Sequence, residues 1–382
     1  MTYAKWAMLA GLAIALLALA CEGSQRGEDP TAPQTAERQA IGQALVIGMN
    51  QAGGPLPLID LLAGVVIGSV DAGYNPEVLR RRTSGQLLVS QTSGPGPARA
   101  EEPSLIVYEL DDLSAPSAII PMPGRPSFIG SPHSVLSRDE RYLYYARVTS
   151  ICPKGRDAEG CDEWSIGVID LDAGAQVAQA DIILGCVPRM VVDPQREETA
   201  LVACGDAGRT SVEFTPDAVR VLRIGPDGKA SQLGAFPGRR TGNWIKSVVF
   251  AGMRADGTYF AVYDDGAVFN SGGEKAVADL LPEEDGQFDL NRDASLRDRY
   301  LLEFGFGLNH TISGVVLLDA AAPEDARKFK LPFAFQHVAP FDERRVALLH
   351  GDGFEVSVLD VETGGVSNAM TLPERVEWLA GG

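Results

Sequence analysis

Short apolar segments separated by turn residues recur from about residue 44 to the end of the chain. Each unit opens with a polar residue and an apolar strand, followed by a turn rich in Asp, Gly, Arg or Glu and a second strand, such as residues 142–146. A third strand reads x-V-x-D-x-x-x-G at residues 168–174 and 358–364, residues 58–64 are a further copy that begins with Leu58, and a weaker fourth strand follows. β-Branched and aromatic segments bounded by Gly, Asp and Pro are typical of strands, and no helical period is sustained. The pattern therefore predicts an all-β fold.

One polar residue opens each repeat unit. These residues are Glu77, His133, Arg189, Lys246, Arg292, His337 and Glu377. They follow one another at intervals of 56, 56, 57, 46, 45 and 40 residues. A period of this length with several short strands per unit is typical of a β-propeller, and seven openings predict seven blades.

The two chain ends complement each other in this pattern. The first strands, at residues 45–49 and 56–63, have no innermost strand before them, whereas residues 375–380 form an innermost strand with nothing after it. Pairing the C-terminal strand with the N-terminal strands of the same blade would complete that blade and remove exposed sheet edges. We therefore predict a closed seven-bladed β-propeller over residues 44–382, with an open sandwich or two smaller domains as the alternative.

Two of the repeat sequences, SVLSRDERYLYYARV and SVLDVETGG, resemble the YVTN-type repeats of seven-bladed bacterial propellers, which are related to WD40-like and amine-dehydrogenase-like propellers. The resemblance extends over residues 44–382, although Ile245 and Asn291 stand where other copies have proline. It implies the fold and leaves the function open, because such propellers bind proteins, sugars, nucleic acids or metals, or act as enzymes.

Residues 1–20 have the pattern of a secretory signal. Lys5 precedes an apolar run from Ala7 to Ala20 that is too short to span a bilayer comfortably. The run ends in Ala18-Leu19-Ala20-Cys21, which resembles a bacterial lipobox with Ala18 where Leu is commoner. The resemblance implies cleavage before Cys21 and lipidation of its thiol, and two or three acyl chains would anchor the protein stably. The alternative is an ordinary signal peptide with an incidental Cys21.

Residues 21–43 are predicted to tether the propeller to the membrane. The segment after Cys21 is polar, contains proline and lacks aromatic residues, as expected of a disordered linker. Glu22 follows the cysteine, whereas Asp at that position retains Gram-negative lipoproteins at the inner membrane. We therefore expect a cell-envelope protein at the outer membrane, on its periplasmic or surface face.

Four further cysteines lie in a chain that we expect to be exported to an oxidising compartment. Cys152 and Cys161 flank a loop between two strands, and a disulfide would hold that loop closed. Cys186 and Cys204 are equally far from Gln195, the centre of a predicted hairpin, so we expect them to be direct cross-strand neighbours that form a second disulfide. Zinc is the alternative for these four residues, although no Cys-x2-Cys spacing occurs.

The formal net charge of −18 argues against binding to nucleic acid, whose phosphates repel an acidic protein. The chain contains no G-x-S-x-G elbow, P-loop, Rossmann fingerprint or haem-attachment motif. We therefore expect no cofactor, and we expect a monomer held at the membrane through the lipid on Cys21.

The innermost strands of a propeller line its central channel, so the seven opening residues are predicted to form a ring at one channel mouth. Arg189, Lys246 and Arg292 come from consecutive blades and would make a cationic arc. Three interpretations remain open: a solvated ion-pair rim, a site for a small anionic ligand or a partner's carboxylate, and a metal site formed by His133, His337, Glu77 and Glu377.

The leader, the tether and the lack of a catalytic motif favour a lipid-anchored, non-enzymatic module that binds a ligand or a protein or acts as a scaffold. The alternative is an enzyme that resembles propeller lactonases or lyases. It would use His133 or His337 as general base and Arg189 or Lys246 to hold an anion.

Overall fold

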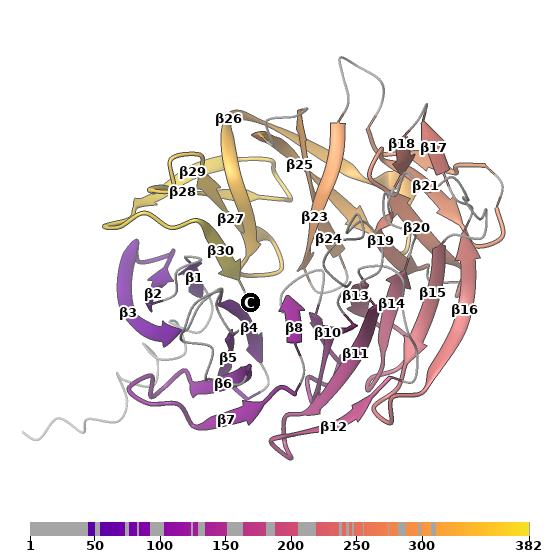
Figure 1. Ribbon diagram of the computed structural model, residues 1–382. Coiled ribbons are helices and arrows are strands. Elements are labelled where there is room, and N and C mark those ends of the chain that lie inside the picture. Colours follow the sequence, from indigo (N-terminus) through magenta and orange to yellow (C-terminus); the bar gives the residue numbers. More distant parts are fainter. Residues whose placement is uncertain are drawn as a thin grey trace, which may run out of the picture. The chain divides into compact units, whose positions relative to one another are not determined.

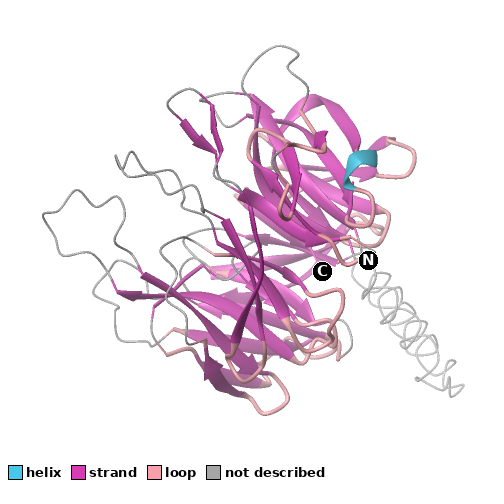
Figure 2. Ribbon diagram, turned by 90° about the vertical axis from the view of Figure 1, so that its right-hand side faces the viewer, coloured by secondary structure: helices cyan, strands magenta, loops and turns pink. Residues whose placement is uncertain are grey.

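The chain divides into two compact units, residues 1–41 and 42–382, and the computed structural model describes residues of the second unit (Figure 1). The described ranges are 45–49, 54–72, 76–81, 84–91, 103–123, 125–128, 134–150, 163–180, 188–204, 219–236, 239–241, 244–246, 248–254, 256–273, 275–281, 288–296, 299–306 and 311–381. Within these ranges every regular element is a strand except the short 3-10 helix η2, Pro323–Asp325 (Figure 2). No helix within them is long and apolar enough to cross a membrane.

Six sheets of four or more antiparallel strands form the blades, which we number along the chain. Blade 1 contains β30 (Trp378–Gly381), β1 (Leu45–Met49), β2 (Gly54–Asp60) and β3 (Val65–Ala72). Blade 2 contains β4 (Glu77–Arg81), β5 (Gln86–Gln91), β6 (Ser104–Glu109) and β7 (Ala118–Pro121). Blade 3 contains β8 (Arg125–Phe128), β9 (Ser134–Leu136), β10 (Tyr142–Ser150), β11 (Glu163–Asp170) and β12 (Ala175–Gln179).

Blades 4, 5 and 6 follow along the chain. Blade 4 contains β13 (Arg189–Val192), β14 (Ala200–Cys204), β15 (Val219–Ile224) and β16 (Ala230–Phe236). A ribbon of β17 (Arg239–Thr241) and β18 (Trp244–Lys246) precedes blade 5, which contains β19 (Val248–Met253), β20 (Tyr259–Tyr263), β21 (Ala267–Asn270) and β22 (Ala278–Asp279). Blade 6 contains β23 (Phe288–Leu296), β24 (Arg299–Phe306), β25 (Thr311–Asp319), β26 (Arg327–Pro340), β27 (Arg345–His350), β28 (Glu355–Asp360) and β29 (Val366–Thr371).

The β-propeller fold is confirmed, but the prediction of seven blades is wrong. Blade 6 is a continuous seven-stranded sheet because β26 is 14 residues long and serves both of the units expected there. Its first part pairs with β25 through Lys330 and Phe329, and its last part pairs with β27 through Val338 and Ala339. The expected break between the units requires turn residues, and the interior of β26 contains only one, Pro332.

The two ends of the chain meet in blade 1. β30 pairs antiparallel with β1, with Ile47 opposite Ala380 and Met49 opposite Trp378. Leu379 and Val46 are buried at this junction. Because β30 occupies the innermost position of a sheet whose other strands come from the N-terminal part, the last residues complete the first blade.

Buried apolar clusters join every blade to the next one, and the series closes on itself. Representative pairs in shared clusters are Leu56 and Val89 for blades 1 and 2, Leu88 and Tyr145 for 2 and 3, Tyr144 and Val202 for 3 and 4, Ala203 and Phe269 for 4 and 5, Phe260 and Phe304 for 5 and 6, and Leu349 and Leu379 for 6 and 1. The core therefore lies between the faces of neighbouring sheets, as expected when twisted blades pack around an axis.

Glycine on a third strand makes room for a large aromatic residue on the second. Gly167 lies opposite Tyr145 in blade 3, and a Cβ atom there would come within 2.3 Å of the tyrosine ring. Gly314 has the same relation to Phe304 in blade 6. The rings thus lie flat across the neighbouring strand, and Tyr145 is fully buried.

Candidate functional site

The D-x-x-x-G pattern of the third strands forms one kind of turn in three places. Asp60, Asp170 and Asp360 each end a third strand, and Oδ1 of each accepts hydrogen bonds from two backbone N–H groups at 2.9 to 3.1 Å. The glycines four residues later, Gly64, Gly174 and Gly364, have φ values of +66°, +62° and +72°. Glycine adopts this left-handed conformation without steric cost, so each turn is specified by two residues.

The second carboxylate oxygen binds an arginine from the turn between the first and second strands. Asp170 Oδ2 lies 2.8 Å from Arg141 Nη2, and Asp360 Oδ2 lies 2.6 Å from Arg344 Nη2. These hydrogen bonds hold the pKa of both carboxyl groups below the ordinary range for Asp. Both carboxylates are therefore ionised at neutral pH, and their bonds stabilise the ends of the blades.

A second kind of ion pair joins successive four-stranded units. In each case an arginine beside the turn between the first and second strands reaches a carboxylate after the third strand of the next unit. The pairs are Arg81–Asp172, Arg254–Glu324 and Arg299–Glu362, with nitrogen–oxygen distances of 2.6, 2.8 and 2.5 Å. We call these three pairs the latches. The third one connects the two halves of blade 6.

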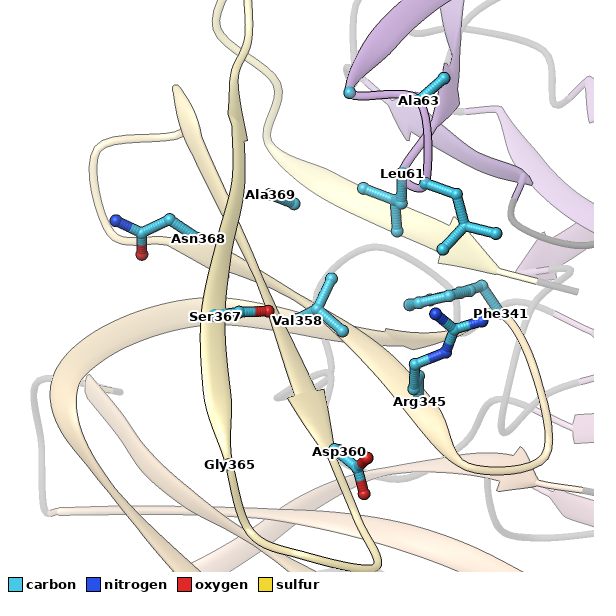
Figure 3. Close-up of a pocket in the computed structure, with 12 residues that line it drawn as sticks. Leu61, Ala63, Phe341, Arg345, Val358, Asp360, Gly365, Ser367, Asn368 and Ala369 are labelled. Atoms are coloured by element: carbon cyan, nitrogen blue, oxygen red, sulfur yellow. The ribbon is translucent and has the colours of Figure 1, made fainter.

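A cavity of about 380 Å³ lies between the second half of blade 6 and blade 1, where the chain ends meet (Figure 3). One wall is the turn at residues 61–64 that follows β2, and the other consists of β27, β28, β29 and the turn before β27. The side chains of Leu61, Phe341 and Val358 converge on it from three different elements (Figure 3). The volume is at the lower end of the range for small-molecule sites, and the lining combines apolar side chains with polar and charged groups.

Arg345 places a cation at this cavity. Its guanidinium carbon lies 5.1 Å from the centre of the Phe341 ring, and its Nε and Nη2 atoms lie 2.7 and 2.6 Å from Asp342 Oδ2. Nη1 forms no hydrogen bond with the described residues, and about a third of the side chain is exposed. A guanidinium that stacks on an aromatic ring and keeps a donor available is suited to binding an anion.

The described lining contains two ionisable side chains, Arg345 and Asp360. Arginine stays protonated in proteins, and the bond to Arg344 keeps the pKa of Asp360 low. Neither group can therefore exchange a proton readily near neutral pH. This chemistry is suited to recognition of a ligand rather than to general acid–base catalysis.

A polar row crosses the second half of blade 6. His350 Nε2 lies 2.8 Å from Ser357 Oγ, which donates a hydrogen bond of 3.1 Å to Asn368 Oδ1. Phe333 stacks on the imidazole with 4.3 Å between ring centres. Ser357 is buried, and its hydroxyl lies between the His350 imidazole and the Asn368 amide oxygen.

The structure places the predicted channel-mouth residues unevenly. Glu77 and Arg189 open β4 and β13, and Glu377 lies directly before β30, as expected for residues at strand entrances. Lys246 ends β18, whereas Arg292 and His337 lie inside β23 and β26. His133 lies outside the described residues, as do the side chains of Glu77, Lys246 and Arg292.

Most of these positions lie in, or directly before, strands at the inner side of the propeller. These inner strands contact one another from blade to blade, and they include β4, β13, β19, β23, β26 and β30. Arg189, His337 and Glu377 all interact with other groups in the protein. Within the described ranges no group of three or more His, Cys, Asp or Glu side chains is placed to hold a metal ion. The binding ring as a whole stays a prediction.

The expected geometry of one cysteine pair is wrong. β13 and β14 pair with Arg189 opposite Ala203, and continuing this register by one residue places Pro188, not Cys186, opposite Cys204. The hairpin turn is therefore centred one residue beyond Gln195. Cys21, Cys152, Cys161 and Cys186 and the side chain of Cys204 lie outside the description, so both disulfides and the lipidation stay predictions.

Sequence reasoning did not find the cavity. Its residues come from the beginning and the end of the chain, and they come together in space only because β30 completes blade 1. The D-x-x-x-G pattern held a signal that could have pointed to this place. The second residue after the aspartate is acidic in two copies, Asp172 and Glu362, but it is Leu62 in the first copy.

The sequence matches no family model, and no curated protein matches it. Among solved structures, it is similar to apo AztD from Citrobacter koseri, at 14% identity over 87% of this chain and 82% of that chain, with a TM-score of 0.50. It is also similar to the β-propeller domain of Cps50 (Swd1) from Myceliophteria thermophila, at 12% identity over 83% of this chain and 93% of that chain, with a TM-score of 0.54. At these identities the similarity shows a β-propeller fold and nothing about ligands.

Proposed function

We propose that this protein is a lipid-anchored β-propeller of the cell envelope that serves as a non-enzymatic binding module. The cavity between blades 6 and 1 is the observation that carries the binding part of the proposal. A ligand's apolar surface would be buried favourably against Leu61, Phe341 and Val358, and the Arg345 guanidinium would orient the ligand. The ionisable groups described there are suited to holding a ligand rather than to transforming it.

The envelope location rests on the sequence of the first 43 residues. A charged start, an apolar run and a small residue before Cys21 support export and lipidation, and Glu22 supports the outer membrane. The polar segment after Cys21 is suited to carrying the propeller away from the bilayer. The net charge of −18 supports a domain that stays off anionic lipid and nucleic acid.

Membrane attachment is tested by expressing the full chain and its Cys21→Ser variant in a Gram-negative host with a labelled fatty acid. We expect label and outer-membrane fractionation for the wild type, and loss of both for the variant. Ser24→Ala, three residues further along, is the matched control and should leave both unchanged. Two outcomes would contradict lipidation at Cys21: wild-type protein without label, or a Cys21→Ser variant that stays in the membrane fraction.

Binding is tested with the full chain in detergent against a panel of small molecules of differing charge, using the melting temperature as readout. We expect at least one chemical class to raise Tm by several degrees, since a ligand at 100 times its Kd adds about 2.7 kcal/mol. Ala369→Trp should fill the cavity and remove the shift, whereas Ala118→Trp, on an exposed position of β7, should retain it. A panel without shifts, or shifts that survive Ala369→Trp, would contradict the role of the cavity.

A further inference from the structure

The arginine of the third latch has an equivalent in the second half of blade 6. Arg299 opens β24 and lies opposite Asp319, the last residue of the third strand of its unit. Arg345 opens β27 and lies opposite Asp360, which ends the third strand of the next unit. The two arginines are thus equivalent by strand register. Arg299 forms a latch to Glu362, so the same reach from Arg345 would lead to the corresponding turn of blade 1.

Two of the three latch carboxylates share a position. Asp172 and Glu362 are the second residues after Asp170 and Asp360, and their backbone N–H groups donate to those aspartates at 3.0 and 2.9 Å. The corresponding residue in blade 1 is Leu62, whose N–H donates to Asp60 at 2.9 Å. Leucine therefore stands where blade 3 and the second half of blade 6 have a carboxylate.

The arginine at the junction between the chain ends is paired and exposed differently from the latch arginines. Arg345 turns to Asp342 in its own turn, and its side chain is 34% exposed, compared with 10% for Arg81, 12% for Arg254 and 27% for Arg299. Leu62 remains 58% exposed although it is a large apolar residue. Arg345 and Leu62 both line the cavity, together with further apolar and polar groups.

We propose that this cavity binds a carboxylate attached to an apolar body, with the ligand's carboxylate taking the place of the missing latch group on Arg345. The proposal rests on the binding function proposed above and names the ligand class. The carboxylate would accept from Nη1 of Arg345, and the apolar body would cover Leu62 and lie against Leu61, Val358 and Ala369. Arginine–carboxylate hydrogen bonds are among the stronger polar contacts in proteins, so the acid is favoured over neutral analogues of the same shape.

The test compares hexanoate with hexanamide, and benzoate with benzamide, by calorimetry on the full chain in detergent. A peptide with a free C-terminus and its amidated form separate a partner's terminal carboxylate from a small acid. We expect each bound acid to be preferred over its amide by about tenfold or more, as for one hydrogen bond to a charged group. Either source of the carboxylate supports the ligand class.

Leu62→Glu installs the missing carboxylate and Leu62→Gln is its neutral control of nearly the same size. Leu62 is exposed, so both variants should fold. We expect Leu62→Glu to raise the ligand-free Tm above that of Leu62→Gln and to abolish binding of the acid, and Leu62→Gln to keep the preference. Arg345→Gln should reduce the acid to the affinity of the amide, and its Tm and circular dichroism verify folding.

The outcomes separate the two proposals. Equal binding of acid and amide, blocked by Ala369→Trp, would overturn the carboxylate inference and leave the binding function intact. Absence of any ligand that depends on the cavity would overturn both. Tight binding of the acid to Leu62→Glu would also refute the inference, because an internal carboxylate should compete for Arg345.

Discussion

Arg299 and Arg345 occupy equivalent register positions in the two halves of blade 6, yet Arg299 pairs with Glu362 in the next unit whereas Arg345 pairs with Asp342 in its own turn. Across its junction Arg299 pairs with Glu362, whereas the corresponding turn of blade 1, which lines the same cavity as Arg345, carries Leu62. Among the described residues, the ion pair that joins the two halves of blade 6 is thus not repeated where blade 6 meets blade 1.

Removal of a latch should loosen one junction selectively. Glu362→Gln deletes the charge that Arg299 and Arg327 share, while Gln keeps the size of the side chain. We expect a small decrease in Tm at low salt that becomes smaller at high salt, because ions screen exposed pairs. Differential scanning calorimetry at two ionic strengths measures it. A decrease that does not depend on salt would indicate lost packing instead.

The buried pair of Asp193 and Arg223 should contribute far more than the latches. Asp193 is fully buried, and it also accepts a hydrogen bond of 2.6 Å from Thr199. Asp193→Ala leaves the guanidinium buried without its counter-ion, so we expect the free energy of unfolding to fall by about 3–5 kcal/mol. Urea denaturation provides the measurement, and Lys229→Ala, from an exposed pair, is the control that should change little.

Two glycines should respond differently to alanine. Gly174 has a φ of +62° and open space around its Cα, so Gly174→Ala should cost about 1–2 kcal/mol through backbone strain alone. Gly167→Ala drives a Cβ into the buried Tyr145 ring and should cost at least as much through overpacking, about 1–3 kcal/mol. Tyr145→Leu should partly rescue Gly167→Ala and leave Gly174→Ala unimproved in urea denaturation. Rescue of both variants would contradict this assignment.

Deletion of residues 377–382 should open the propeller. It removes β30 together with the buried Leu379, and it exposes the edge of β1 that β30 covers. Unpaired edges associate with other chains, so we expect a lower Tm and self-association on size-exclusion chromatography with light scattering. Leu379→Ala, which keeps the backbone pairing, should destabilise by about 2–5 kcal/mol without self-association. A truncated chain that stays monomeric with unchanged Tm would rule out the closure.

Acid should weaken the blade ends through Asp170 and Asp360. Hydrogen bonds from Arg141 and Arg344 lower the pKa of these carboxyl groups in the folded state. Their contribution is therefore complete above the unfolded pKa of about 3.9 and is lost as pH falls through the lower folded values. Urea midpoints between pH 2 and pH 7 should show this loss below about pH 4. Asp170→Asn should be less stable at pH 7 and show a shallower decline in acid.

The local pattern of the sequence predicted much of the fold. The period of apolar segments identified strands, the D-x-x-x-G residues identified the turns after Asp60, Asp170 and Asp360, and the unmatched chain ends indicated where β30 and β1 would pair. These features depend on neighbours along the chain, on turn chemistry and on the need to cover a sheet edge. The sequence alone contains the information for all three.

Tertiary structure decided the number of blades and the position of the cavity. Whether β26 breaks into two strands depends on how β25 and β27 pair with it, and continuous pairing merged two expected units. The register of β13 with β14 likewise displaced Cys204 from its expected partner. The opposition of Arg345 and the Leu62 turn joins residues from the two ends of the chain, and only closure through β30 brings them together. Sequence determined which elements form because their causes are local, whereas structure decided which side chains meet because their contacts are not.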